Sequence, residues 1–457
     1  MPLIFSRLQN PPKKVIIPLL LVLMLLYLYG VQQQFVLVNT DMTRTDQAAY
    51  MATAEQLKTS QYATLTDRAR MPAFSFLLSL FYEPGMSRDL LFYRGKLLNT
   101  AVSLISLPIL FGVFRRYLPL FTAVNLSLIH AFTIYIFKAP FVQAELLFYL
   151  FNFLGYLLMC RFLWQPESDR GTWKTAVFTG ILLGMAHLTK ASILPGLALF
   201  IGIAVLQAIF RQWKTSSPSR QFLRNLATPA LVLLFFLLTI FPYIQNSKAQ
   251  FGHYFYNVNS TFYIWYDHWD DVEAGTKAHG DRVGWPDMPP EEIPSAAKYF
   301  SEHSFTQIGQ RLFDGLLVIL ITTLNSYGYW LYLFLLFGFV LVVALFNWQW
   351  TKTIVTQHLF LTLFIIGYFT LYILLYAWFW PISSGNRFTL ALFSPMIFTL
   401  AFIMYRLFEN QLLLKFNSQS TRMVHWGQLL NWTFSALLLV DLCITLSGRI
   451  STVYGGY

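Results

Sequence analysis

The chemistry that this sequence could support starts with Asp46, a carboxylate that follows the first long apolar stretch. Thr45 precedes it and has a side chain typical of a helix N-cap. We therefore expect Asp46 in the first helical turn, where the helix dipole favours its ionised form. An ionised carboxylate between water and membrane can accept a proton from a hydroxyl or an amine. Tyr50 follows four residues later, on the same helix face. Asp46 is thus a candidate catalytic base, and the alternative is an ordinary solvated aspartate at a helix start.

Four basic residues at or near the expected outer ends of the membrane spans could bind a phosphate. Arg70 stands two residues before Pro72, which biases the preceding backbone to an extended form. Its guanidinium could bind a phosphate through two parallel hydrogen bonds, or it could extend to lipid headgroups. Arg387 begins a helix, where its charge opposes the helix dipole, so we expect an anion to compensate it. Lys138 and Lys190 are expected at the outer ends of apolar spans.

Glu145 is the one acidic residue in an otherwise uncharged run from 141 to 160. A charge within a membrane span is costly, so a functional role and a basic partner are the default expectation. Lys138 or Lys190 is the expected partner. The alternative is a purely structural ion pair.

A metal or nucleotide site is only weakly indicated. Asp267, His268, Asp270, Asp271 and Glu273 could bind a divalent metal ion, but their spacing follows no fixed pattern and fits a solvated acidic loop better. No glycine-rich nucleotide loop, P-loop or Ser-His-Asp pattern in a fitting context is present. We therefore predict no particular cofactor, and a divalent metal ion stays an open alternative.

The elements that must position these residues are predicted to be membrane helices. The chain has 457 residues, of which 56% are hydrophobic and only 12% are charged. Several apolar stretches reach the roughly 18–20 residues needed to cross a bilayer, and they lack the alternation of barrel strands. We predict an all-α polytopic membrane protein with about eleven transmembrane helices, near 15–38, 90–114, 118–136, 140–163, 174–190, 191–210, 226–244, 328–347, 355–380, 388–408 and 428–447. The first span is longer than a signal-peptide core and is expected to be a retained anchor.

Charge distribution predicts the orientation of these spans. We place the N-terminus in the cytoplasm. Apart from those in the first external segment (39–89), most basic residues then lie in cytoplasmic segments, and nearly all acidic residues lie in external ones. The net charge of +11 is therefore mainly a topology signal and a match to anionic membrane lipids, and no nucleic-acid partner is expected.

Two external segments, 39–89 and 245–327, are too long to be simple turns, and such loops usually carry function. Within the second, 304–325 could be an interfacial helix or a further span. We divide the chain into an N-terminal catalytic membrane module (1–244), the external segment 245–327 and C-terminal membrane helices (328–457).

Taken together, these positions resemble the GT-C type of membrane glycosyltransferase, particularly the protein O-mannosyltransferases and the lipid A aminoarabinose transferases. Asp46-Gln-Ala-Ala-Tyr50 resembles the family's Asp-Glu-x-x-Tyr pattern, with Gln47 in place of the glutamate. Arg70-Met-Pro72 is similar to a later basic residue followed by proline. The family's acidic residue near the fourth span, its Gly-Leu-x-x-Leu-Thr-Lys run and its Arg-aromatic pair correspond to Glu145, Gly184-Met-Ala-His-Leu-Thr-Lys190 and Arg387-Phe388.

The resemblance implies an inverting transfer from a polyprenyl-phosphate-linked sugar to a glycan, lipid or protein acceptor. It implies catalysis at the outer face of a membrane, in a bacterial envelope (the inner membrane) or in the endoplasmic reticulum. Asp46 would be the base, and Glu145 would orient a substrate. Tyr50, Arg70, Lys138, Lys190 and Arg387 would bind the substrate.

Three alternatives remain. A flippase or transporter of lipid-linked glycans would use the same basic residues without a base, and a non-catalytic envelope scaffold would need no chemistry. An O-antigen-type polymerase or ligase would carry a large late external loop, where this chain has only the short turn 381–387.

Overall fold

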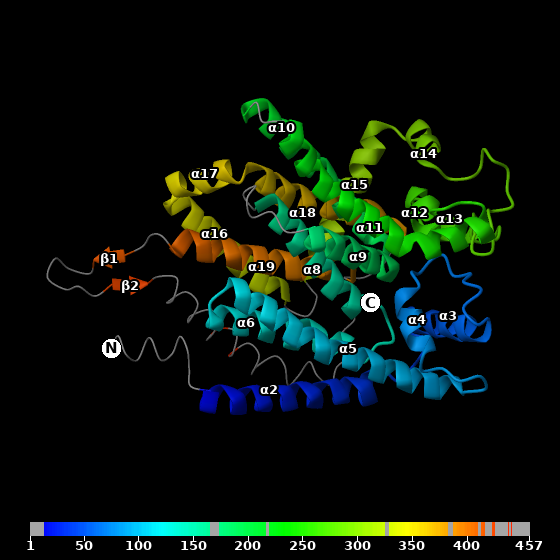
Figure 1. Cartoon of the computed structure of the whole chain (residues 1–457). Coiled ribbons are helices and arrows are strands. Elements are labelled where there is room, and N and C mark those ends of the chain that lie inside the picture. The colour runs from blue at the N-terminus through cyan, green and yellow to red at the C-terminus, as the bar shows by residue number, and fades with distance from the viewer. Residues whose placement is uncertain are drawn as a thin grey trace.

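The fold was analysed in a computed structural model that describes residues 13–164, 173–215, 219–324, 329–382, 387–409, 413–415 and 423–425, together with positions 437 and 440. Helices account for nearly all of the described structure (Figure 1). The N-terminal half contains α2 (Lys13–Gln33), the π-helix η1 (Gln34–Val38), α3 (Gln47–Thr59), α4 (Ala73–Ser79), α5 (Arg88–Tyr117), α6 (Leu120–His130), the π-helix η2 (Ala131–Tyr135), α7 (Ile136–Lys138), α8 (Glu145–Trp164), α9 (Trp173–Thr189), η4 (Ala191–Ile193), α10 (Leu194–Thr215) and α11 (Ser219–Phe251).

The rest of the described chain contains several short helices, four longer helices and one small hairpin. These are α12 (Val258–Thr261), η5 (Tyr263–Trp265), α13 (Trp269–Ala274), α14 (Ala296–Glu302), α15 (Phe305–Leu324), α16 (Tyr329–Phe346), α17 (Trp348–Gln357), α18 (Leu359–Phe379), η6 (Trp380–Ile382), α19 (Arg387–Glu409), β1 (Leu413–Lys415) and β2 (Met423–His425). The two strands pair antiparallel, with Leu414 opposite Val424.

Eight helical segments of the described chain are long and apolar enough to cross a membrane, and α16 with α17 would make a ninth. That pair bends by 101° at Asn347, so it is either a broken span or a re-entrant loop. The predicted span 174–190 forms α9, a helix of 17 residues. The segment 304–325, expected as an interfacial helix or a further span, forms α15, which is not among the candidate spans of the described chain. The predicted span 428–447 lies almost entirely outside the described residues.

Three of these segments form the centre of the bundle. Of the most apolar window in each, 72% is buried in Leu120–Lys138 and 67% in both Glu145–Trp164 and Arg387–Arg406, against 28–39% in the other candidate spans. Their apolar side chains pack around Phe114, Phe153 and Phe398. Because the central helices begin or end at Lys138, Glu145 and Arg387, their packing places these three charged residues at one end of the core.

Close helix contact fixes the position of α9, and with it Lys190. Gly180 and Gly184 face α11 so closely that an added Cβ would lie 2.5 Å from the carbonyl oxygen of Val232 and 2.6 Å from Cβ of Thr239. Small residues of this kind allow two membrane helices to pack backbone against backbone. Lys190 directly follows α9, and its backbone N–H donates to Ala186 O at 2.9 Å.

Both long polar segments gather at one end of the bundle, on the right in Figure 1, opposite α17 and the hairpin. Segment 39–87 carries α3 and α4, and segment 252–304 carries α12 to α14. They meet directly, since Val258 N–H donates to Arg68 O at 3.1 Å and Asn259 Nδ2 donates to Ala69 O at 2.7 Å. The fold thus places the two predicted external segments on the same side.

Candidate functional site

The site is centred on the carboxylate of Asp46, which is the N-cap residue of α3. The sequence predicted Thr45 as the cap, so the helix starts one residue later than expected. Thr45 has φ of 60°, a strained value for a β-branched residue, and its hydroxyl accepts a hydrogen bond from Gln143. The side chain of Asp46 makes no capping hydrogen bond to α3. It therefore points away from its own helix and is free to pair with other groups.

Two arginines from distant parts of the chain hold this carboxylate. Arg70 Nη2 lies 2.6 Å from Asp46 Oδ1, and Arg387 Nη1 contacts Oδ2. Asp67 Oδ2 lies 3.2 Å from Arg70 Nη1 and fixes that side chain from the other side. Arg387 begins α19, where its charge opposes the helix dipole, and Asp46 supplies the compensating anion that the sequence predicted.

Electrostatics keep Asp46 ionised. Burial alone would raise its pKa, but the charges of Arg387 and Arg70 and their hydrogen bonds hold the pKa well below the usual value for an aspartate. For Arg70, burial acts to lower the pKa, whereas Asp46 and Asp67 raise it further above its already high value. The cluster is thus a carboxylate between two permanent cations.

A second ion pair lies beside the first. Lys190 Nζ is 2.8 Å from Oε1 of Glu145, which begins the central helix α8. Lys190 is therefore the hydrogen-bonded partner, one of the two lysines predicted for this glutamate. Lys138 is buried at the end of α7 and interacts electrostatically with Glu145, Arg387 and Lys190. Since Glu145 also interacts with Arg387, the two ion pairs form one connected charge cluster.

Tyr50 lies within the field of both acids. It is buried on α3, its ring meets Phe74 edge-on, and its hydroxyl is acted on by the charges of Glu145, Asp46, Arg70 and Arg387. Burial, and next the charge of Glu145, raises the pKa of Tyr50 well above its ordinary value. Its hydroxyl therefore keeps its proton and can serve as a neutral hydrogen-bond donor. All seven side chains selected from the sequence belong to this cluster.

Several polar atoms of the cluster are buried without a hydrogen-bond partner among the described residues. They are Nε of Arg70, Nε of Arg387 and Oε2 of Glu145. Leaving a buried donor or acceptor unpaired costs about 1–3 kcal/mol each. Such atoms persist in binding sites because a ligand or ordered water satisfies them. The cluster therefore has unused hydrogen-bonding capacity of both signs.

Gln47 has a structural role that its place in the motif did not reveal. Its side chain is fully buried, and Oε1 accepts from Asn39 Nδ2 and from Val142 N–H, each at 2.8 Å. Its Nε2 donates to Asn39 Oδ1 at 2.9 Å and to two backbone carbonyls. A glutamate could accept the first two bonds but donate none of the others. Gln47 is thus a neutral connector that fastens the start of α3 to the segment before α8.

The contacts that position Arg70 were not predicted from the sequence. Asp67 Oδ1 accepts from the backbone N–H groups of Ala69 and Arg70, at 2.9 and 3.2 Å. Arg68 is completely buried against α11, where its guanidinium lies over the rings of Tyr243 and Phe251 and donates to Asn246. The only indication of these contacts in the sequence was the dense charged run Asp-Arg-Ala-Arg at 67–70. The partners of Arg68 could not be predicted, because they lie about 175 residues away.

The donor set does not suit a divalent metal ion. Asp46 is paired with two guanidiniums, and Glu145 is paired with an ammonium group through Oε1, so both carboxylates already face positive charge. Among the described residues no three His, Cys, Asp or Glu side chains gather closely enough to hold a metal. In the acidic run 267–273, Asp267 is bound to Arg311, His303 and Tyr299.

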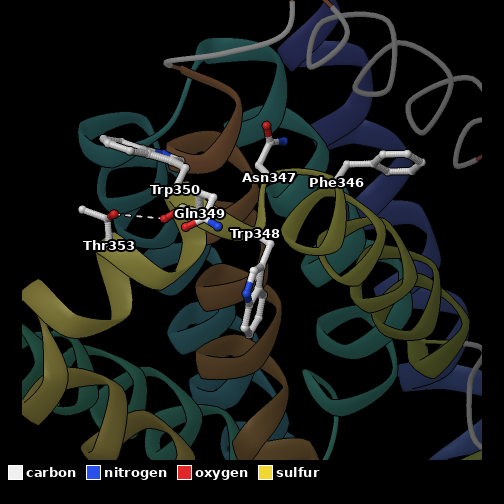
Figure 2. Close-up of a pocket in the computed structure, with 6 residues that line it drawn as sticks. All are labelled: Phe346, Asn347, Trp348, Gln349, Trp350 and Thr353. Atoms are coloured by element: carbon white, nitrogen blue, oxygen red, sulfur yellow. Dashed lines mark hydrogen bonds between the residues drawn. The ribbon is translucent and has the colours of Figure 1, made fainter.

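A cavity of about 500 Å³ lies elsewhere, at the bend between α16 and α17 (Figure 2). Its lining contains no acidic or basic side chain; it consists of Phe346, Asn347, Trp348, Gln349, Trp350 and Thr353. Figure 2 shows Phe346 and Trp350 pointing away from each other on opposite sides of the bend. This cavity lacks groups for acid–base chemistry, and α17 lies at the far end of the bundle from α3.

No family model matches the sequence, and the search of curated proteins finds no match. Solved structures do resemble the chain. An Archaeoglobus fulgidus oligosaccharyltransferase tethered to an acceptor peptide with the NVT sequon matches with a TM-score of 0.52 and 14% identity, covering 96% of this chain. The archaeal oligosaccharyltransferase AglB from the same organism, in complex with an inhibitory peptide and a dolichol-phosphate, matches with a TM-score of 0.48 and 12% identity over 95% of this chain.

The present chain spans 56% of the length of each of these two structures. At 14% identity the likeness to the sequon-peptide structure is one of fold. The fold class predicted from the sequence, a polytopic all-α membrane protein of the GT-C type, is confirmed by that likeness.

Proposed function

We propose that this protein is a membrane glycosyltransferase that moves a sugar from a polyprenyl-phosphate donor to an acceptor at the outer face of the membrane. The observation that carries the proposal is the charge cluster itself. The polar segment 39–87 supplies Asp46 and Arg70, and the start of α19 supplies Arg387. These side chains meet at the end of the bundle where the two long polar segments lie. Combined with a GT-C-type fold, such a cluster suits a phosphate-bearing donor.

In this proposal the cations bind the donor's phosphate. Arg70 and Arg387 have free Nε donors beside the Nη atoms that now hold Asp46, so each can present a two-pronged contact to phosphate oxygens. Lys190 and Lys138 add positive charge from the core side. These groups stabilise the negative charge that develops as the phosphate leaves, which is usually the largest electrostatic contribution to such catalysis.

Asp46 acts as the general base on the acceptor. The acceptor's oxygen or nitrogen attacks the anomeric carbon and passes its proton to Asp46, while the bond between that carbon and the phosphate oxygen breaks. The phosphate leaves with the bonding electron pair as a lipid monophosphate held by the arginines. One displacement inverts the anomeric configuration, and no separate acid is needed for this leaving group.

Glu145 and Tyr50 orient the substrate in this scheme. Glu145 Oε2 is a buried acceptor without a partner among the described residues, which suits a sugar hydroxyl. Tyr50 offers a neutral donor next to it. The acceptor is a glycan, a lipid or a protein. The fold neighbour was solved with a tethered acceptor peptide, which makes a peptide one concrete candidate.

The test combines a missing product with a single substitution. A strain that lacks the protein is expected to lose one sugar from an envelope lipid, glycan or protein, detected by mass spectrometry. Wild type and the Asp270→Asn variant, which changes an exposed external carboxylate, should restore that sugar. Asp46→Asn should lower the initial transfer rate about 10²–10⁴-fold, the usual contribution of a general base. An unchanged envelope in the deletion strain would contradict the proposal.

A flippase of lipid-linked glycans is the main alternative. It would bind the same phosphate with the same cations but form no covalent product. Purified protein in liposomes with labelled donor and a mixed acceptor pool separates the two, because only a transferase moves the label off the lipid. Label that crosses the bilayer without any transfer would favour the flippase.

A further inference from the structure

Asp46 presents a conflict within its own site. A carboxylate that bridges two guanidiniums is a weak proton acceptor, and two arginines that already share an anion are poorly available to a phosphate. We propose that Asp46 is the internal counter-ion of the phosphate site, and that the donor's phosphate displaces it from Arg70 and Arg387 and thereby frees it to accept a proton. This inference rests on the proposed function.

The hydrogen-bond geometry favours a phosphate over the aspartate at these arginines. Each guanidinium gives Asp46 one Nη atom, to opposite carboxylate oxygens, while the Nε atoms stay buried without a partner among the described residues. A phosphate has enough oxygens to accept from Nε and Nη of both arginines at once. Exchange of the carboxylate for a phosphate would therefore satisfy two donors that Asp46 leaves unpaired.

Asp46 is also able to leave. Its side chain is 24% exposed and makes no capping hydrogen bond to α3. Among the described residues, its ion pairs with the two arginines hold it in its present direction. The carboxylate can therefore turn from the arginines toward water.

The arginines keep other anchors when Asp46 turns away. Arg70 remains paired with Asp67 at 3.2 Å, in a turn whose backbone N–H groups the same aspartate caps. Arg387 remains at the start of α19 within the field of Glu145. The phosphate site is therefore preformed, and only its internal anion has to move.

This exchange sets the order in which the substrates bind. Before the donor binds, Asp46 is held ionised by both arginines and cannot activate an acceptor effectively. Once phosphate oxygens take its place, its carboxylate loses two cationic neighbours and becomes a stronger base. Donor would bind before acceptor, and the lipid monophosphate product, which carries more negative charge than the donor, would hold the arginines until it leaves.

Binding of a short-chain isoprenyl monophosphate to the purified full chain, measured by calorimetry in detergent, tests the inference. If the bridge is closed in about 90% of molecules, removing the competitor should tighten binding about tenfold. We expect this gain for Asp46→Asn. The matched control is Glu55→Gln, which removes an equal charge from α3 but contacts neither of the two arginines, since Glu55 pairs with Arg88. It should change the affinity much less. Equal affinities in Asp46→Asn and wild type, or equal gains in both variants, would overturn the inference.

A second measurement uses the wild-type protein and does not depend on folding of a variant. A cryo-electron microscopy structure with the isoprenyl monophosphate bound should show phosphate oxygens on Arg70 and Arg387, with the Asp46 side chain turned off both. A carboxylate that still bridges them would overturn the exchange. Failure of the proposed function is distinguishable, because Asp46→Asn would then bind the phosphate more tightly and yet no product would be found with wild type.

Discussion

Two aspartates of this protein, Asp46 and Asp267, each bind an arginine and a second nitrogen-bearing side chain, and their surroundings differ in one respect. At Asp267, Arg311 donates from Nε, Nη1 and Nη2, to Trp378 O, the carboxylate and Ile264 O respectively. Two further hydrogen bonds reach the same carboxylate, from the Tyr299 hydroxyl to Oδ1 at 2.8 Å and between His303 Nε2 and Oδ2 at 2.9 Å. None of the side-chain atoms in this second group is among the buried unpaired atoms of the described chain.

At Asp46 the ion pairs are equally short, but the cluster around them is incomplete. Both arginines keep an unpaired Nε, and the neighbouring Glu145 keeps an unpaired oxygen. The Asp267 group therefore has a structural role, since it joins the segment 264–311 to the end of α18. Asp267, Tyr299, His303 and Arg311 are called the clasp below. Asp46 resembles a site with a place for a ligand. The comparison teaches that unsatisfied hydrogen-bond capacity, and not the presence of an ion pair, distinguishes the two.

The largest expected difference between the two groups concerns the arginines. Arg70→Lys and Arg387→Lys should each lower the transfer rate about 10²–10³-fold, because a lysine keeps the charge but loses the planar fork. Arg311→Lys should leave the rate nearly unchanged and lower the melting temperature instead. Initial rates and thermal melting of the three variants check this. A rate loss in Arg311→Lys as large as in the other two would erase the distinction.

Gln47→Glu tests whether the start of α3 needs an amide. The substitution removes the donors to Asn39 and to the carbonyls of Asp41 and Arg44, and it places a carboxylate in a fully buried position. We expect a loss of about 3 kcal/mol of stability, measured by chemical denaturation, from lost hydrogen bonds and burial of charge. Gln47→Met, which has a similar volume, gives the cost of losing the bonds without the charge. A glutamate variant as stable as wild type would contradict the connector role.

Arg311→Ala measures the clasp itself. Its guanidinium is buried, whereas Asp267 is 41% exposed and can be rehydrated. We therefore expect a loss of about 2–3 kcal/mol, at the lower end of what a buried pair costs when one partner is removed. The matched control is Glu273→Gln, which breaks the exposed pair with Lys277 and should leave the stability nearly unchanged. Similar losses in both variants would mean that the Asp267 group is an ordinary surface contact.

The membrane helices and the members of the charge cluster could be predicted from the sequence, because the physical signals for both are local. The length of apolar runs predicts spans, and an ionisable residue within or beside them is costly enough to be noticed. The pairings could not be predicted, because the partners lie far apart in the sequence. Arg387 lies 341 residues after Asp46, and Lys190 lies 45 residues after Glu145.

Two features left almost no local signal. Gln47 was noticed only as a departure from a family pattern, and one of its hydrogen bonds comes from Val142, 95 residues later. Arg68 was interpreted as a basic residue in an external loop, although it is completely buried. In both cases a partner comes from an element far away in the sequence, and residue type alone does not indicate burial.

The smallest expected effect is a pH dependence that belongs to the clasp. Burial acts to raise the pKa of Asp267, but the hydrogen bonds from Tyr299 and His303 and the charge of Arg311 lower it below the usual value of about 3.9. A lowered folded-state pKa contributes stability that is fully present above the unfolded-state pKa and is lost as pH falls through the folded-state value. Wild type should therefore be more stable than Asp267→Asn at about pH 5, and the difference should shrink below about pH 4. Melting temperatures of both proteins across this range test it. A difference that grows on acidification would mean that the carboxylate is not stabilised in its ionised form, and the contrast with Asp46 would then lose its structural reference.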